Sequence, residues 1–219
     1  MIIKTTNNQE YFWIKIPRTA TYSFKELFKR YNEITEENHT HHTYKELCER
    51  HNQKLPAFTL VRHPLNRFIS IIYYLASRHS NTTSDARRLW ESTESCVDFL
   101  NSYYDRNCEL KGISIQSMFL DTNIENCIHK PVGAFFKTQV EYAYHPKVNI
   151  FYYEKIHEFT EWISTTLQYD VSNIPTINYT CKTHTKVDVD FKHPDFIRTV
   201  ENLYYIDYKI FNYPLQYLT

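Results

Sequence analysis

Glycine is almost missing from this chain, because only 2 of its 219 residues are Gly. A phosphate-binding loop of the Walker A type is therefore excluded, and no G-K-S/T sequence occurs. Turns have to be formed by Asn, Asp, Ser and the 8 prolines. Any loop that binds a phosphate group must therefore be built without glycine-dependent backbone conformations.

The sequence also lacks a cysteine pattern and a long apolar run. Neither a zinc ribbon nor a disulfide framework is indicated, because the 5 cysteines contain no C-x-x-C pair. They are widely spaced: Cys48, Cys96, Cys108, Cys127 and Cys181. No stretch of about 18 apolar residues is present, so no membrane span is predicted. The apolar run within residues 1–16 is too short and too interrupted for a signal peptide. We expect reduced thiols and a cytoplasmic protein, with a secretory lumen left open if an anchor has been removed.

Charge of one sign is not in excess, since 25 Lys and Arg balance 25 Asp and Glu. No nucleic-acid partner is therefore expected, and any basic site must be local. With 42% hydrophobic and 23% charged residues, the chain can bury a core. At about 100–200 residues per domain, we expect a single domain over residues 1–219.

Short apolar runs alternate with segments of helical periodicity. Strands are predicted at residues 11–16, 56–61 and 148–153, followed by helices at 23–31, 66–77 and 155–167. The first helix places Phe24, Leu27 and Phe28 on one face. The alternation predicts an α/β fold with a central, mainly parallel sheet flanked by helices. Further helices are predicted at 43–51, 86–90, 97–104 and 195–211.

The loop at residues 17–23, PRTATYS, follows the first predicted strand and opens a helix. It contains one arginine and four hydroxyl-bearing residues. Unpaired N–H groups and the positive end of the helix dipole favour an anion at such a place. The loop therefore predicts a site for a phosphate or sulfate group. The alternative is an ordinary Ser/Thr N-cap beside a surface arginine.

The second strand ends in a similar loop, VRHPLNRFIS. Arg62 leaves the end of the strand, and Ser70 follows about two helical turns after the turn at Pro64. Both side chains are expected to reach one phosphate group. The alternative is that Arg62 pairs with a surface carboxylate and that Ser70 has no special role.

The two loops together resemble the phosphosulfate-binding elements of sulfotransferases that use 3′-phosphoadenosine 5′-phosphosulfate (PAPS). IPRTATYS is similar to the family's P-K-S/T-G-T/G-T/S loop, and VRHPLNRFIS to its V-R-N/D-P-x-x-R-x-x-S element. FYYEK resembles a strand-end R-Y/F-E-D/N segment, and NLYYIDYKIFNYPL resembles the ending of the carbohydrate sulfotransferase branch. The resemblance spans residues 12–215, apart from 86–136. It implies a P-loop-like sulfotransferase fold.

The resemblance also implies a role for each matching residue. The 5′-phosphosulfate would be held by the first loop: Arg18, Thr19, Ala20, Thr21, Tyr22 and Ser23. The 3′-phosphate would be held by Arg62 and Ser70. A later loop that closes over the cofactor would contribute Lys182 or Thr183, in a segment with Asn178 and His184.

Two residues of the first loop differ from the family pattern. Arg18 stands where the family has Lys, and it would neutralise charge on the leaving phosphate with a different reach and geometry. Ala20 replaces a Gly. If that position needs a positive φ, the loop is strained by roughly 1 kcal/mol or more.

Sulfuryl transfer to a hydroxyl needs a base, and His41 or His42 is expected to supply it. The resemblance favours His41, with Glu46 either orienting the histidine or lying exposed on a helix. A metal site formed with His39 and a plain solvated loop are the alternatives. No metal is expected to be required.

Two further side chains have open assignments. Gln139 resembles a family residue that lines the acceptor cleft, or it is a surface amide before a strand. Arg67 either assists Arg62 or points to solvent.

These observations predict a sulfotransferase that moves the sulfuryl group from PAPS to a hydroxyl, expected on a carbohydrate, by in-line displacement. An insertion at about 80–136 would bind the acceptor. A non-catalytic module that binds PAPS or its product PAP (3′-phosphoadenosine 5′-phosphate) is the first alternative. A phosphoryl transferase of the P-loop type is the second. The acceptor and the oligomeric state stay open.

Overall fold

The computed structural model describes residues 1–32, 41–78, 84–103, 136–174 and 186–217. The chain divides into two compact units. The first contains residues 1–63 and 137–178, and the second contains residues 64–136 and 179–219. The single domain with an insertion at about 80–136 stays a prediction.

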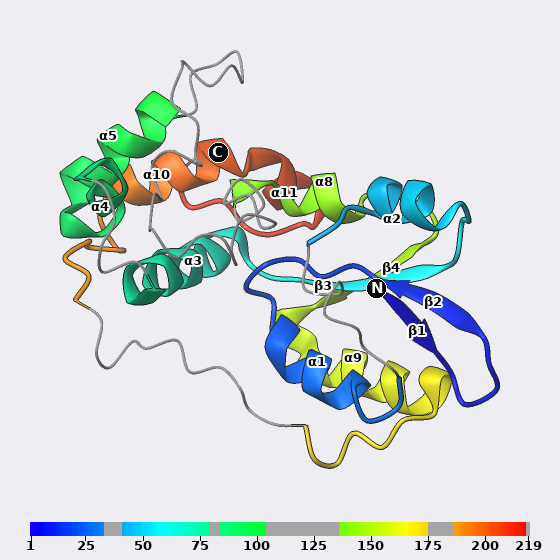
Figure 1. Cartoon of the computed structure of the whole chain (residues 1–219). Coiled ribbons are helices and arrows are strands. Elements are labelled where there is room, and N and C mark those ends of the chain that lie inside the picture. The colour runs from blue at the N-terminus through cyan, green and yellow to red at the C-terminus, as the bar shows by residue number, and fades with distance from the viewer. Residues whose placement is uncertain (33–40, 79–83, 104–135, 175–185, 218–219) are drawn as a thin grey trace. The chain divides into compact units, whose positions relative to one another are not determined.

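The first unit is built on a four-stranded sheet with the order β1-β2-β3-β4 (Figure 1). Its strands are β1 (Ile2–Lys4), β2 (Glu10–Trp13), β3 (Ala57–Val61) and β4 (Val148–Tyr152). The strands β2, β3 and β4 are parallel, and β1 pairs with β2 in an antiparallel hairpin. The prediction of a mixed α/β fold with a mainly parallel sheet is therefore confirmed, although β1 was not predicted.

Helices cover both faces of this sheet (Figure 1). On one face, α1 (Thr21–Phe28) and α9 (Ile156–Trp162) pack on the strands, and the rings of Trp13 and Phe28 lie 4.7 Å apart. On the other face, α2 (Tyr44–His51) brings Tyr44 within 6.3 Å of Phe12. Neighbouring strand residues point to opposite faces, which explains why Phe12 and Trp13 meet different helices.

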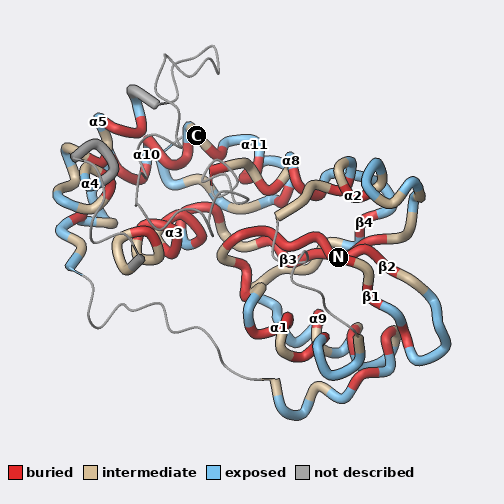
Figure 2. The backbone as a smooth tube through the Cα atoms, in the orientation of Figure 1, coloured by how far each residue is buried: buried red, intermediate tan, exposed pale blue. Residues whose placement is uncertain are grey.

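The central strand β3 is buried along its whole length, as is typical of a parallel strand with both faces covered. Its one polar side chain, Thr59, donates a hydrogen bond to the carbonyl of Ile14 at 2.8 Å. Figure 2 shows that buried residues gather along the strands and on the inner sides of the helices. The remaining elements in the described part of the unit are α8 (Gln139–Ala143), η3 (Tyr153–Lys155) and η4 (Ile163–Leu167).

The described part of the second unit is helical, with a core that includes Phe68, Leu100 and Phe196. Its helices are α3 (Pro64–Arg78), α4 (Ser84–Glu91), α5 (Thr93–Tyr103), α10 (Pro194–Leu203) and α11 (Tyr205–Ile210). The single helix predicted at 195–211 is wrong, because the chain leaves the helical conformation at Tyr204. Among the described helices, none has the length and apolar character needed to span a membrane.

Candidate functional site

The carboxyl ends of β2, β3 and β4 lie at one edge of the sheet, because the three strands are parallel. The chain leaves β2 through the loop that opens α1, leaves β3 at Arg62, and leaves β4 into η3. Ligands of open α/β sheets bind outside such strand ends. The predicted loop residues of the first unit therefore lie where this type of sheet places a binding site.

The first loop is shaped by its own residues. The hydroxyl groups of Thr19 and Thr21 both donate to the carbonyl of Ile16, at 2.9 and 2.8 Å. Arg18 and Ala20 have positive φ angles of 68° and 61°. Ala20 thus takes a left-handed conformation that glycine adopts without strain, at a cost of about 1 kcal/mol.

The N-terminus of α1 is not closed by a side chain. Its N-cap residue is Ala20, and no side chain among the described residues makes a capping hydrogen bond there. The interpretation of this loop as an ordinary Ser/Thr N-cap is therefore wrong. Thr21, Tyr22 and Ser23 form the first turn, where helix N–H groups and the helix dipole favour a negatively charged group. The geometry is suited to an anion.

Arg62 joins the second strand end to this loop. Its Nη1 atom donates to the carbonyl of Arg18 at 3.3 Å. Its guanidinium group also lies over the ring of Tyr153, 4.7 Å from the ring centroid. The ends of β2, β3 and β4 therefore supply Arg18, Arg62 and Tyr153, respectively. The two arginines carry a permanent positive charge.

Residues far away in the sequence hold the backbone at the end of β3. The Gln139 side chain is fully buried; its Oε1 atom accepts from the N–H of Arg62, and its Nε2 atom donates to the Arg62 carbonyl, both at 2.8 Å. Glu154 Oε1 accepts from the N–H of His63 at 2.8 Å. The interpretation of Gln139 as a surface amide is therefore wrong. No local pattern could have revealed this contact, since 77 residues separate the partners.

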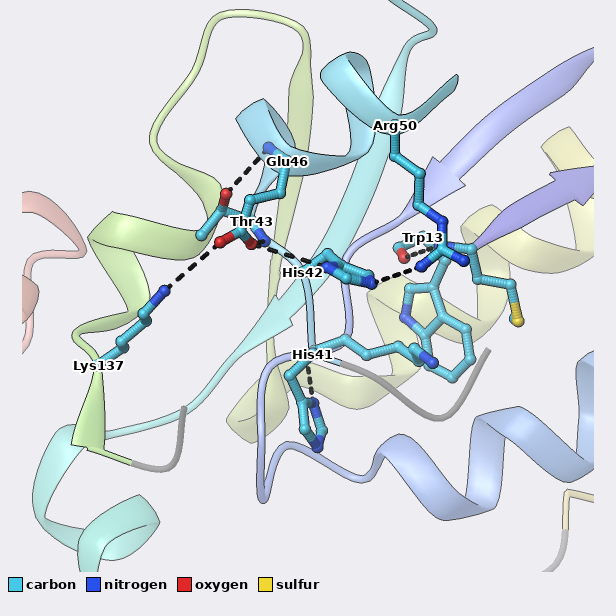
Figure 3. A network of polar contacts seen from close by, with 9 residues as sticks. Trp13, His41, His42, Thr43, Glu46, Arg50 and Lys137 are labelled. Carbon is cyan, nitrogen blue, oxygen red and sulfur yellow. Dashed lines mark hydrogen bonds and ion pairs between the residues drawn. The ribbon is translucent and has the colours of Figure 1, made fainter. Parts of the chain in front are cut away.

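His41 is held beside the first loop (Figure 3). Its Nδ1 atom lies 2.6 Å from the carbonyl oxygen of Lys15, which precedes Ile16 in the chain. A carbonyl can only accept a hydrogen bond, so Nδ1 carries the hydrogen and the lone pair of the neutral ring is on Nε2. The contact thus selects the tautomer that can accept a proton at Nε2.

His42 has different partners, although it is the next residue. Arg50 Nη1 lies 3.1 Å from its Nε2 atom and, as a guanidinium, can only donate to it. Burial, followed by the charge of Arg50, lowers the pKa of His42. The lone pair of His42 is therefore already engaged by a cation.

Glu46 contacts His42 rather than His41, with Oε2 3.9 Å from His42 Nδ1 (Figure 3). It forms a capping box with Thr43 and an ion pair with Lys137 at 3.7 Å. Burial opposes ionisation of Glu46, but the hydrogen bonds from Thr43 and the charge of Lys137 together lower its pKa. Its structural role is therefore to fix the start of α2.

Ser70 and Arg67 belong to α3 in the second unit, and both are buried. The guanidinium of Arg67 lies 5.7 Å from the ring centroid of Tyr204, so the interpretation of Arg67 as a solvent-facing residue is wrong. The expected contact of Ser70 and Arg62 with one phosphate joins residues of two units and stays a prediction.

The remaining expected residues lie outside the described part of the chain: His39, Asn178, Lys182, Thr183 and His184. Within the described ranges, no three His, Cys, Asp or Glu side chains gather as metal ligands would.

Comparison with protein-family models, curated proteins and solved structures found no match to this chain. Its function is therefore inferred from the two loop motifs and from the geometry at the strand ends.

Proposed function

We propose that the protein is a sulfotransferase that moves the sulfuryl group of PAPS to a hydroxyl acceptor, expected to be a carbohydrate. The observation that carries this proposal is the contact between the two loops, in which Arg62 Nη1 lies 3.3 Å from the Arg18 carbonyl. PAPS carries a phosphosulfate and a separate 3′-phosphate on one ribose. Recognition of this molecule requires two anion sites at close range, and two neighbouring strand ends supply suitable residues.

The residues at the first strand end fit the 5′-phosphosulfate. The uncapped first turn of α1 supplies N–H donors, and Arg18 supplies a permanent charge. When bound, PAPS supplies the sulfuryl group that is transferred. Arg62 would hold the 3′-phosphate through its planar set of donors.

The roles of Arg18 and His41 follow from their charge and tautomer. The Nε2 lone pair of His41 would accept the proton of the acceptor hydroxyl. Arg18 would stabilise negative charge on the phosphate that leaves. His42 is the weaker candidate for the base because Arg50 donates to its Nε2 atom.

A calorimetric titration with PAP, 5′-AMP and ADP tests the proposal on the wild type and on Arg62→Ala. We expect PAP to bind in the micromolar range and 5′-AMP and ADP to bind much more weakly, and a loss of roughly 2–4 kcal/mol for PAP in the variant, because a charged phosphate contact is removed. Equal binding of the three nucleotides, or no binding of any, would contradict the proposal.

A transfer assay with labelled PAPS and a panel of hydroxyl acceptors separates an enzyme from a binding module. Higher turnover in Arg18→Lys than in the wild type indicates an enzyme whose loop is weakened by the arginine. If PAP binds but neither form transfers sulfate to any acceptor, the protein is a non-catalytic PAP-binding module.

A further inference from the structure

We propose that Gln139 is a positioning residue that sets the selectivity of this site for a 3′-phosphate; the inference rests on the proposed function. The oxygen and the nitrogen of its side-chain amide both form hydrogen bonds with one residue, Arg62. Oε1 accepts from the N–H of Arg62 and Nε2 donates to the Arg62 carbonyl, each at 2.8 Å. The Gln139 side chain is completely shielded from solvent.

The position of Arg62 explains why such a contact is needed. The paired part of β3 and β4 ends with Val61 opposite Tyr152, and Arg62 is the next residue. Its backbone therefore lies just beyond the β3–β4 ladder. Gln139 offers an acceptor and a donor to the same residue, as the facing residue of an antiparallel hydrogen-bonded pair would. The Gln139 side-chain amide thus fixes the backbone one residue beyond the end of the β3–β4 pairing.

Fixing the Arg62 backbone also limits where its guanidinium group can lie. That group is held between the Arg18 carbonyl at 3.3 Å and the Tyr153 ring at 4.7 Å. An arginine that is oriented before binding loses less side-chain entropy when it binds a phosphate. Without Gln139, the Arg62 backbone loses both hydrogen bonds with the side-chain amide. We expect the 3′-phosphate contact to weaken while the first loop keeps its internal hydrogen bonds from Thr19 and Thr21.

Gln139 is itself well anchored. It is the first residue of α8, which begins with a capping box formed by Thr138 and Glu141. Lys137, two residues before Gln139, pairs with Glu46 on α2 at 3.7 Å. These contacts hold the start of α8, so the amide is kept at a fixed place beside the end of β3.

The test compares the ratio of the 5′-AMP and PAP dissociation constants in the wild type and in Gln139→Met, which removes the amide without adding charge. We expect this ratio to fall about tenfold, with 5′-AMP binding unchanged, because the two ligands differ only in the 3′-phosphate. The matched control is Thr59→Val, which removes another buried hydrogen bond of β3 to a backbone carbonyl. It should reduce stability and leave the ratio unchanged.

A second variant and a second measurement guard against misfolding of Gln139→Met. Gln139→Asn keeps the amide but is one methylene too short to span both groups, so its ratio should also fall. In the wild type, the amide hydrogen of Arg62 should exchange slowly with solvent.

The outcomes are distinguishable. If the wild type prefers PAP and the folded Gln139 variants have the same ratio of dissociation constants as the wild type, this inference alone is overturned. Rapid exchange of the Arg62 amide in the wild type would overturn it as well. A wild type without preference for PAP would overturn the proposed function and, with it, this inference.

Discussion

The two strand-end loops of the first unit acquire their shape in different ways. The loop after β2 is tied internally, because Thr19 and Thr21 both donate to the Ile16 carbonyl. The loop after β3 is held from outside, by Gln139 and Glu154 on later segments. We expect a loop of the first kind to depend less on its neighbours, although Arg62 also contacts the Arg18 carbonyl. A loop of the second kind depends on the folding of distant elements, and its arginine can be disturbed by substitutions far away in the sequence.

The largest expected effect concerns His41, the proposed base beside the first loop. We expect His41→Gln to lower turnover by about 10²–10⁴-fold, because it removes the Nε2 lone pair that Lys15 selects through Nδ1. His42→Gln is the matched control and should stay within a few-fold of the wild type. Initial rates with labelled PAPS and the best acceptor of a panel measure both. Equal losses of turnover in the two variants would contradict the assignment of His41 as the base.

The next effect sharpens the difference between the two arginines. Arg62→Lys keeps the charge but loses the planar fork, so we expect PAP to bind about tenfold more weakly. Arg18→Lys restores the residue of the resembling family and should leave PAP affinity within about threefold. Calorimetry on both variants measures the contrast. Similar losses in the two would mean that both loops recognise phosphate in the same way.

A smaller effect concerns strain in the first loop. Ala20 has a φ of 61°, so Ala20→Gly should raise the free energy of unfolding by about 0.5–1 kcal/mol. The control is Ala143→Gly in α8, which should lower it by about 1 kcal/mol because Gly is unfavourable in a helix. Urea denaturation measures both changes. A destabilised Ala20→Gly would show that the relief of strain is smaller than the loss of the buried Ala20 methyl group.

The smallest effect is a pH dependence of stability from His42. Its pKa is lowered in the folded protein, first by burial and then by Arg50. Below the ordinary value of about 6.5 the unfolded chain therefore binds a proton that the folded chain does not, and stability falls as the pH falls. His42→Gln should flatten this decline. His51, whose pKa is lowered in the same direction, is present in both proteins and cancels from the difference.

The same contrast between the loops explains what the sequence could predict. The strands β2, β3 and β4 and the helix stripe of Phe24, Leu27 and Phe28 are local patterns, and each was found. The sequence pointed to Ala20 as the position where a positive φ would cause strain, and its φ is 61°. The two hydrogen bonds between Gln139 and Arg62 could not be predicted, because they depend on where the start of α8 lies relative to the end of β3. The strand β1 was missed because it has only 3 residues and is defined by its hairpin partner.

The most direct test of the central claim is a phosphorus NMR spectrum of PAP bound to the protein, because its two phosphates give separate signals. Both signals should shift on binding to the wild type. In Arg62→Ala the 3′-phosphate signal should return towards its free position while the 5′-phosphate signal stays shifted, and Arg18→Ala should show the reverse. If the phosphate signals do not shift on binding to the wild type, the assignment of one phosphate to each loop is contradicted. It is also contradicted if both signals change by the same amount in each variant.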